Sequence, residues 1–163
     1  MRHNHLFILI HTYSDRDMAA HLPKDNYRKI VPFEERKIKA SLILKQHSDR
    51  IPVVVECSDQ LQNQHPLKKN KFIVPFELTL AQFMFIIRKH MKLEPTHAVF
   101  VFINNKLHPT TTMMGELYAN EKDPDGFMYL CVFQESTFGQ NHNAKHLKPS
   151  LHNASVTDTL SGL

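Results

Sequence analysis

The side chains best equipped for chemistry in this sequence are two cysteines, Cys57 and Cys131, and twelve histidines. A cysteine becomes a nucleophile where a neighbouring base or cation stabilises its thiolate, and neither residue belongs to a motif that supplies one. Both also lack the CxxC spacing of redox or zinc sites. We therefore expect structural thiols of a cytosolic protein, and a thiol enzyme using either cysteine stays as an alternative function.

The histidines between residues 27 and 138 stand singly, without the spacing of metal ligands on one element. They are His47, His65, His90, His97 and His108. The phosphate-binding patterns GxGxxG and GxxxxGK[ST] are absent from the sequence, as are the catalytic patterns HExxH and GxSxG. The sequence thus predicts a protein that is not an enzyme and that uses neither a metal nor a cofactor.

A binding role has better support from the extended segment Lys71–Pro75, which follows Lys68 and Lys69. Its final proline has no N–H for a sheet ladder, so we expect a strand at a sheet edge. Such an edge offers unpaired N–H and C=O groups to an extended peptide, and the lysines would attract acidic residues that flank it. The alternative is a hairpin with a solvated fringe of lysines.

Phe138 and Gly139 end the apolar part of the chain, and a polar segment begins at Gln140. Because glycine lacks a Cβ, a strand that leaves a domain through Phe-Gly can enter a narrow catalytic cleft. By itself the pattern fits two interpretations, a site of cleavage after Gly139 and an ordinary strand end.

Composition indicates one domain: the 163 residues are 42% hydrophobic and 22% charged. We expect a flexible extension over residues 1–26, a folded domain over 27–139 and a removable, disordered tail over 140–163, which has no aromatic residue. Apolar runs such as Ala98–Ile103 are far too short to span a membrane. A net charge of +4 is too mild to predict nucleic-acid binding.

The apolar periodicity predicts the elements that must position these residues. The predicted strands are Ile51–Glu56, Lys71–Pro75, Ala98–Ile103 and Phe127–Phe133. The predicted helices are one over Pro32–His47, one that follows a capping box of Thr79 and Gln82, and a short one over Met114–Tyr118. The solvated side of the first helix is expected to carry Glu34, Glu35, Arg36 and Lys37. A polar loop is expected after Cys57, a turn with left-handed backbone angles at Asn104-Asn105, and a bend at Asp125-Gly126.

This order predicts an α+β fold of the ubiquitin-like β-grasp type. It would have two amino-terminal helices, a four-stranded mixed sheet and disordered termini.

Several stretches match one family in order and without large gaps. They are PFEERK (Pro32–Lys37), DRIPVVVE (Asp49–Glu56), KNKFIVPFELTLAQF (Lys69–Phe83), IIRKHMKL (Ile86–Leu93), INNKLHPT (Ile103–Thr110), GELY (Gly115–Tyr118) and EKDPDGFMYLCVFQESTFG (Glu121–Gly139). Through them the sequence from Tyr27 to Gly139 resembles the autophagy ubiquitin-like modifiers, the family of GABARAP and microtubule-associated protein light chain 3. The stretches point to both subfamilies, so the resemblance leaves the subfamily open.

The resemblance implies a modifier that other enzymes process. A cysteine protease would cleave after Gly139, and ubiquitin-like activating and conjugating enzymes would join the new carboxylate to phosphatidylethanolamine. The protein would then move from the cytoplasm to the autophagosomal membrane. There it would recruit cargo receptors through short aromatic and aliphatic motifs with acidic flanks, with tubulin as a further partner. The alternative on the same fold is a non-conjugated peptide-binding adaptor in vesicle or microtubule-linked traffic.

The resemblance also implies the residues of the sites. Cleavage and conjugation would involve Phe138, Gly139 and Gln140. An aromatic pocket would be lined by Ile43, Pro52, Val54, Lys71, Ile73 and Phe127. An aliphatic pocket would be lined by Phe72, Val74, Pro75, Leu78, Phe83, Ile86 and Ile87, of which Leu78, Phe83 and Ile87 also suit the core. Arg50, Lys69 and Lys71 would meet acidic groups.

Two residues near these pockets depart from the family pattern. Lys39 stands where an acidic residue is usual, which favours more acidic partners. His90 replaces a usual arginine, which predicts a weaker contact that depends on pH around the ordinary histidine pKa of about 6.5.

Overall fold

The computed structural model describes residues 26–134. The expectations for the amino-terminal extension, for Phe138, Gly139 and Gln140, and for the tail concern residues outside this range.

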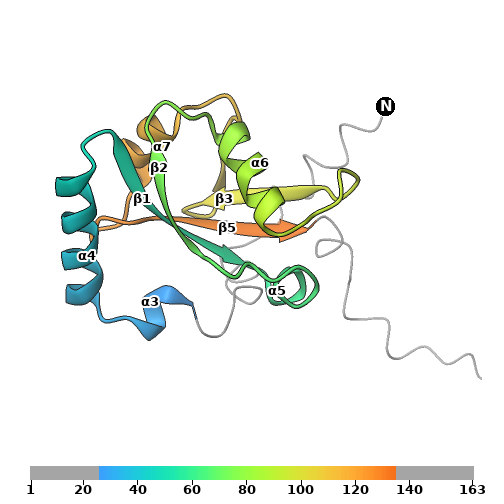
Figure 1. Cartoon of the computed structure of the whole chain (residues 1–163), viewed down its shortest axis with the longest axis horizontal. Coiled ribbons are helices and arrows are strands. Elements are labelled where there is room, and N and C mark those ends of the chain that lie inside the picture. The colour runs from blue at the N-terminus through green and yellow to red at the C-terminus, as the bar shows by residue number, and fades with distance from the viewer. Residues whose placement is uncertain (1–25, 135–163) are drawn as a thin grey trace, which may run out of the picture.

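The centre of the molecule is a five-stranded sheet with the strand order β2-β1-β5-β3-β4 (Figure 1). The strands are β1 (Arg50–Cys57), β2 (Lys71–Pro75), β3 (Val99–Ile103), β4 (Lys106–Leu107) and β5 (Met128–Gln134). β1 and β5 run parallel, and the other neighbouring strands run antiparallel. This mixed sheet, with a helix crossing between the first hairpin and the later strands, confirms the predicted α+β, ubiquitin-like fold.

The number of strands is a correction, because four were predicted and the sheet has five. The additional strand, β4, has two exposed residues that pair with Phe102 and Ile103 of β3. Two residues are too few for the alternation that predicts a strand. The turn that leads into β4 was predicted correctly, since Asn104 and Asn105 have φ values of 49° and 61°.

The helices are α3 (Tyr27–Ile30), α4 (Phe33–Gln46), α5 (Asp59–Gln64), α6 (Leu80–His90) and α7 (Met114–Glu121). The first two confirm the predicted pair of amino-terminal helices. The segment of α5 was predicted as a loop, which is wrong. Ser58 caps α5, its hydroxyl accepting a hydrogen bond from the Leu61 N–H at 3.4 Å, and Leu61 is the residue of α5 that is buried. A single buried side chain gives no helical periodicity, so the sequence pattern could not predict this helix.

The start of α6 follows the predicted capping box. The Thr79 hydroxyl accepts from the Gln82 N–H at 3.3 Å, and the Gln82 side chain accepts from the Thr79 N–H at 2.9 Å. The helix then buries Leu80, Phe83 and Ile87 in the main core. Side chains of β1, β3, β5 and α7 complete that core on the same face of the sheet.

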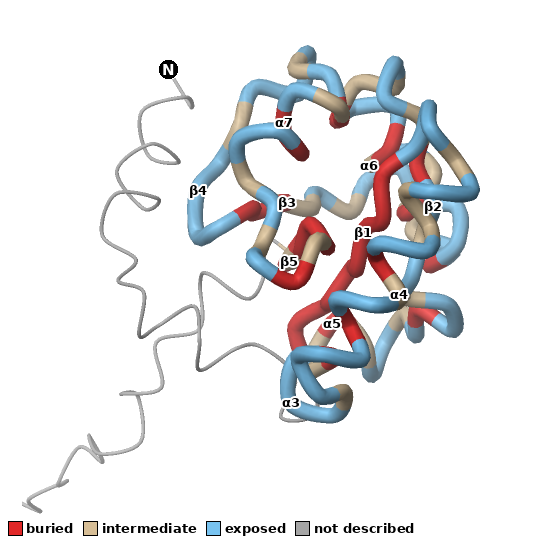
Figure 2. The backbone as a smooth tube through the Cα atoms, turned by 90° about the vertical axis from the view of Figure 1, so that its left-hand side faces the viewer, coloured by how far each residue is buried: buried red, intermediate tan, exposed pale blue. Residues whose placement is uncertain are grey.

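A smaller cluster covers the opposite face of the sheet, where α3 and α4 pack. It contains Tyr27, Ala40, Val54, Phe127 and Tyr129. Buried residues concentrate along β1 and β5, while most of α4 and β4 faces solvent (Figure 2). Strand β2 therefore lies at an edge of the sheet, between α6 on one face and α4 on the other.

Candidate peptide-binding edge

Strand β2 is an edge strand, as the sequence predicted, because its one neighbour in the sheet is β1. Backbone hydrogen bonds outside the two ends of this hairpin fix the pattern of pairing. The Val55 N–H donates to the Asn70 carbonyl at 2.8 Å, and the Phe76 N–H donates to the Asp49 carbonyl at 3.1 Å. Hydrogen-bonded pairs alternate with non-bonded pairs along an antiparallel ladder. These two hydrogen-bonded pairs therefore determine which of the residue pairs between them are hydrogen-bonded and which are not.

By this alternation Phe72 and Val74 direct their backbone groups toward β1, and Lys71 and Ile73 direct theirs outward. The partner of Ile73 is Pro52, a residue without an N–H, and a non-bonded position suits it. The outward N–H and C=O groups of Lys71 and Ile73 are the groups that an added strand would pair with.

The side chains of Lys71 and Ile73 lie on the α4 face of the sheet, opposite Val54 and Pro52 of β1. The Lys71 ammonium lies 5.2 Å from the centre of the Tyr27 ring, in cation–π geometry. Ile73 is 40% exposed, which is unusual for an isoleucine of a strand and leaves an apolar surface in solvent.

Beneath this surface, Val54 and Phe127 are buried and Ile43 of α4 is partly buried. The Phe127 and Tyr27 rings meet edge to face with centres 5.6 Å apart. The predicted residues of the aromatic pocket thus lie together on one face, with Val54, Phe127 and Pro52 as its buried floor.

On the α6 face, the partly buried Phe72 packs edge to face against two rings of α6. The centres of the Phe83 and His90 rings each lie 5.5 Å from its own. Val74, Phe83 and Ile87 are exposed by 2% or less, so they support this face from the core. The accessible residues predicted for the aliphatic pocket are Phe72, Pro75, Leu78 and Ile86, with His90 exposed at its border.

Within residues 26–134, Lys69 and Lys71 form no ion pair with a carboxylate. Lys69 and Lys71 are exposed, and Arg50 has a long 3.7 Å contact with Asp49. Lys39 instead forms an ion pair with Glu35 one helical turn away, and the hydrogen bond with that carboxylate raises the pKa of Lys39. The charge of Lys39 is therefore partly offset by Glu35 before any peptide arrives.

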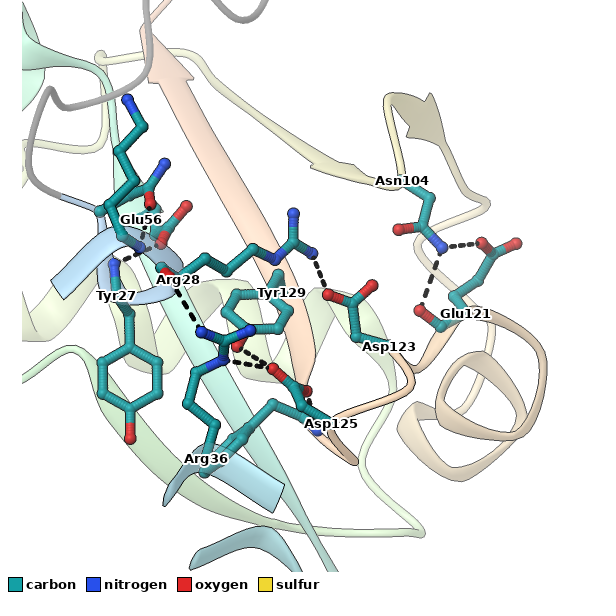
Figure 3. A network of polar contacts seen from close by, with 12 residues as sticks. Tyr27, Arg28, Arg36, Glu56, Asn104, Glu121, Asp123, Asp125 and Tyr129 are labelled. Atoms are coloured by element: carbon teal, nitrogen blue, oxygen red, sulfur yellow. Dashed lines mark hydrogen bonds and ion pairs between the residues drawn. The ribbon is translucent and has the colours of Figure 1, made fainter. Parts of the chain in front are cut away.

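The α4 face is held in place by a buried polar network that was not predicted (Figure 3). Arg36 Nε of α4 donates to Asp125 Oδ2 across 2.6 Å, and the Tyr129 hydroxyl donates to the same oxygen at 2.6 Å. Arg36 also donates to the carbonyls of Arg28 and Val31, which ties α3 to α4. The sequence interpretation placed Arg36 on the solvated side of its helix, and the structure shows it 8% exposed.

The electrostatics of this network follow from its geometry. Burial alone would raise the pKa of Asp125, but hydrogen bonds from Tyr129 and Arg36 together lower that pKa below its ordinary value. Burial and the neighbouring Asp125 carboxylate raise the pKa of Tyr129. The network therefore holds Asp125 charged and Tyr129 neutral, and both states strengthen the contact with Arg36.

The turn before β5 brings this carboxylate close to α4. Gly126 has a φ of 85°, and a Cβ built at this position would lie 2.9 Å from the Ala40 Cβ. A glycine is needed here both for the backbone angle and for the approach of the helix. The predicted bend at Asp125-Gly126 is thus confirmed, and it has a packing role.

The two thiols do not form a reactive site. Burial raises the pKa of Cys57 to about 12, and burial also raises the pKa of Cys131 to about 12. Thiols with such values are protonated at neutral pH, which argues against a nucleophilic role. Over residues 26–134 there is no cluster of three or more His, Cys, Asp or Glu side chains suited to a metal, and no helix long and apolar enough to cross a bilayer.

Comparison with known proteins agrees with this fold. Residues 35–139 match the model of the family described as "Autophagy protein Atg8 ubiquitin like". The chain is 43% identical over 108 residues to Autophagy-related protein 8A of Oryza sativa, a match that covers 66% of this chain and 90% of the relative. It is 42% identical over 113 residues to Autophagy-related protein 8 of Neurospora crassa, covering 69% and 93%.

The crystal structure of Trypanosoma brucei ATG8 superposes with a TM-score of 0.63 at 33% identity. The superposition covers 69% of this chain and 97% of that one. The sequence matches and the shared fold together show that the chain belongs to the Atg8 family of autophagy ubiquitin-like proteins, the family of GABARAP and microtubule-associated protein light chain 3.

Proposed function

We propose that this chain is a ubiquitin-like modifier that is joined through Gly139 to phosphatidylethanolamine and that recruits cargo receptors to the autophagosomal membrane. The observation that carries the proposal is the pairing of two features. The family match ends at Gly139, and strand β2 presents outward backbone groups between two apolar surfaces.

In this proposal residues 27–139 are the modifier and residues 140–163 are a tail that a cysteine protease removes. The activating enzyme joins the Gly139 carboxylate to the AMP portion of ATP, with release of pyrophosphate, and a thiol of the ubiquitin-like enzymes then displaces AMP. The lipid amine attacks the resulting thioester of the conjugating enzyme, which forms the amide bond and releases the thiol. Two acyl chains, each contributing roughly 0.8 kcal/mol per buried CH₂, would convert a cytoplasmic domain into a firmly anchored one.

The receptor site in this proposal is the edge of β2. A receptor segment adds to Lys71 and Ile73 as a strand, its aromatic side chain lies on the α4 face, and its aliphatic side chain lies on the α6 face beside Phe72. Lys69, Lys71 and Arg50 attract the acidic residues that flank the motif, mainly by speeding the encounter.

The test is the intact mass of the full chain after exposure to lysate of its own cells. The modifier should end at Gly139, and Gly139→Ala should abolish both the cleavage and the lipid-bearing form, whereas Asn141→Ala should leave both unchanged. Survival of the tail on the unmodified chain, together with normal membrane recruitment of Gly139→Ala, would instead support the non-conjugated adaptor.

A further inference from the structure

The outer face of α6 and the loop after it form a second surface, separate from the edge of β2. A cavity of about 590 Å³ opens there, with Phe85, Leu93 and Pro95 as its apolar lining. Phe85 is 57% exposed, so most of its ring faces solvent although it lies in the middle of a helix. Phe85, Leu93 and Pro95 together form an apolar patch, and such patches are typical of surfaces that a partner covers.

This surface is positively charged. Lys89 and Lys92 line the cavity, and the Lys89 ammonium lies 4.5 Å from the centre of the Phe85 ring. Neither lysine forms an ion pair with a carboxylate within residues 26–134. The lining includes one acidic residue, Glu94, against these lysines and Arg88, so a partner with negative charge is favoured.

Arg88 fixes the loop after α6 in position beside the helix. Its guanidinium donates to the carbonyl of His97 at 2.6 Å and to the carbonyl of Glu94 at 2.7 Å, which holds the loop after α6 against the helix. The shape of the cavity is therefore built by side-chain to backbone hydrogen bonds within the described residues.

The position of this surface relative to the carboxyl end of the domain indicates its partner. Gln134, the last residue of β5, pairs with Val99, the first residue of β3, and Pro95 precedes Val99 by four residues. The end of α6, the start of β3 and the end of β5 lie at the same end of the molecule (Figure 1). Gly139 follows Gln134 by five residues, which can span at most about 18 Å.

We propose that the surface of Phe85, Lys89 and Lys92 contacts the anionic bilayer to which Gly139 is joined. Phe85 lies among the lipid headgroups, and the two lysines lie next to anionic phosphates, as in interfacial amphipathic helices. The inference rests on the proposed function, because the lipid at Gly139 brings the bilayer within about 18 Å of Gln134. A soluble acidic peptide would match the charge, but the anchor gives it no such proximity.

This contact would orient the domain on the membrane. The carboxyl end of α6 faces the bilayer, while the outward backbone groups of Lys71 and Ile73 lie along the free edge of β2 and their side chains lie on the α4 face. Their outward groups therefore stay open to receptors. A tether without this contact would let the domain rotate freely and would fix no such geometry.

The absence of tryptophan from the chain allows a direct test. Phe85→Trp creates a single fluorescent reporter at an exposed site, and Phe33→Trp on α4, at a residue 41% exposed, is the matched control. In both variants Gly139→Cys of the full chain is coupled to maleimide-headgroup lipid in phosphatidylcholine vesicles, with or without phosphatidylserine. A chain that keeps Gly139 checks that Cys57 and Cys131 do not couple.

The expected result is a blue shift of the Phe85→Trp emission on phosphatidylserine vesicles, with quenching by brominated acyl chains, and neither effect for Phe33→Trp. Lys89→Glu with Lys92→Glu should abolish the shift while coupling and thermal unfolding stay the same. Because the coupling is chemical, it does not depend on natural conjugation at Gly139. An unshifted Phe85→Trp, an equal shift at both positions, or a shift produced by acidic peptides and not by vesicles would overturn the proposal.

Discussion

Arg36 and Asp125 are joined by an ion pair of 2.6 Å although 89 residues separate them in the chain. The side chain of Asp125 is 1% exposed and that of Arg36 is 10% exposed, so the pair lies in the interior between α4 and the turn before β5. Ile43 and Lys39, which border the proposed aromatic pocket, belong to the same helix. The ion pair therefore fixes the helix that forms one wall of the receptor site.

Removal of the Asp125 charge should destabilise the protein strongly. Asp125→Asn keeps the shape of the side chain but leaves the Arg36 guanidinium buried without its anion, which typically costs about 3–5 kcal/mol. The matched control is Asp123→Asn, whose partner Arg28 is 41% exposed, and which should cost at most about 1 kcal/mol. Urea unfolding of the two variants measures the difference, and equal losses would contradict a structural role for the buried pair.

The stability that Glu56 contributes to the fold should decrease as pH rises. Burial raises the pKa of Glu56 above 4.5, so the folded state holds the proton more tightly than the unfolded state does. The contribution of Glu56 to stability is then complete below its unfolded pKa and is lost as pH rises through the folded pKa. Glu56→Gln cannot ionise and can still accept the 3.0 Å hydrogen bond from the Tyr27 N–H.

We therefore expect Glu56→Gln to unfold at a higher temperature than the wild type at neutral pH, and the difference to shrink as pH falls toward 4.5. Glu77→Gln removes the same charge from an exposed position and serves as the control. The measurement is the melting temperature of the wild type and of both variants over that pH range. A gain for Glu56→Gln that grows in acid would show that the sign is wrong.

Local patterns predicted those parts of the fold that short stretches of sequence determine. Thr79 and Gln82 predicted the start of α6, and Asn104 and Asn105 predicted the turn into β4. Both features depend on residues at most three positions apart. Arg36 could not be placed in this way. It lies among charged neighbours, and it is buried because Asp125, from a distant turn, accepts its hydrogen bond. The Tyr129 hydroxyl of β5 donates to the same carboxylate.

In the candidate site, too, local sequence predicted some features, and contacts between distant residues determine the others. Strand alternation puts Lys71 and Ile73 on one face and Phe72 on the other, and Pro75 indicated the edge. On helix α6, apolar character does not distinguish a peptide contact from a core residue, since Phe83 and Ile87 are as apolar as the accessible Ile86. The packing of the structure makes the distinction: Phe83 and Ile87 lie in the main core and support the α6 face from within.

Gly126 should tolerate no side chain. Alanine at this position must adopt a φ near 85° and place its Cβ 2.9 Å from the Ala40 Cβ, so we expect Gly126→Ala to lose about 1–3 kcal/mol of stability. A double-mutant cycle with Ala40→Gly separates the two causes. If the contact matters, Ala40→Gly should cost less in the Gly126→Ala background than in the wild type. Strictly additive effects would leave the backbone angle as the sole cause.

The proposed receptor site can be tested by reversing a charge at each of the two edges of the sheet. Lys71→Glu on β2 should weaken binding of an acidic-flanked aromatic and aliphatic peptide at least tenfold, about 1.4 kcal/mol, because it reverses the charge beside the added strand. Phe72→Ala should do the same by removing the ring that packs on Phe83. Lys106→Glu makes the same charge change on β4, the opposite edge, and should leave affinity unchanged. Calorimetry with the folded variants measures all three, and an equal loss for Lys71→Glu and Lys106→Glu would reduce the effect to net charge and remove β2 as the docking edge.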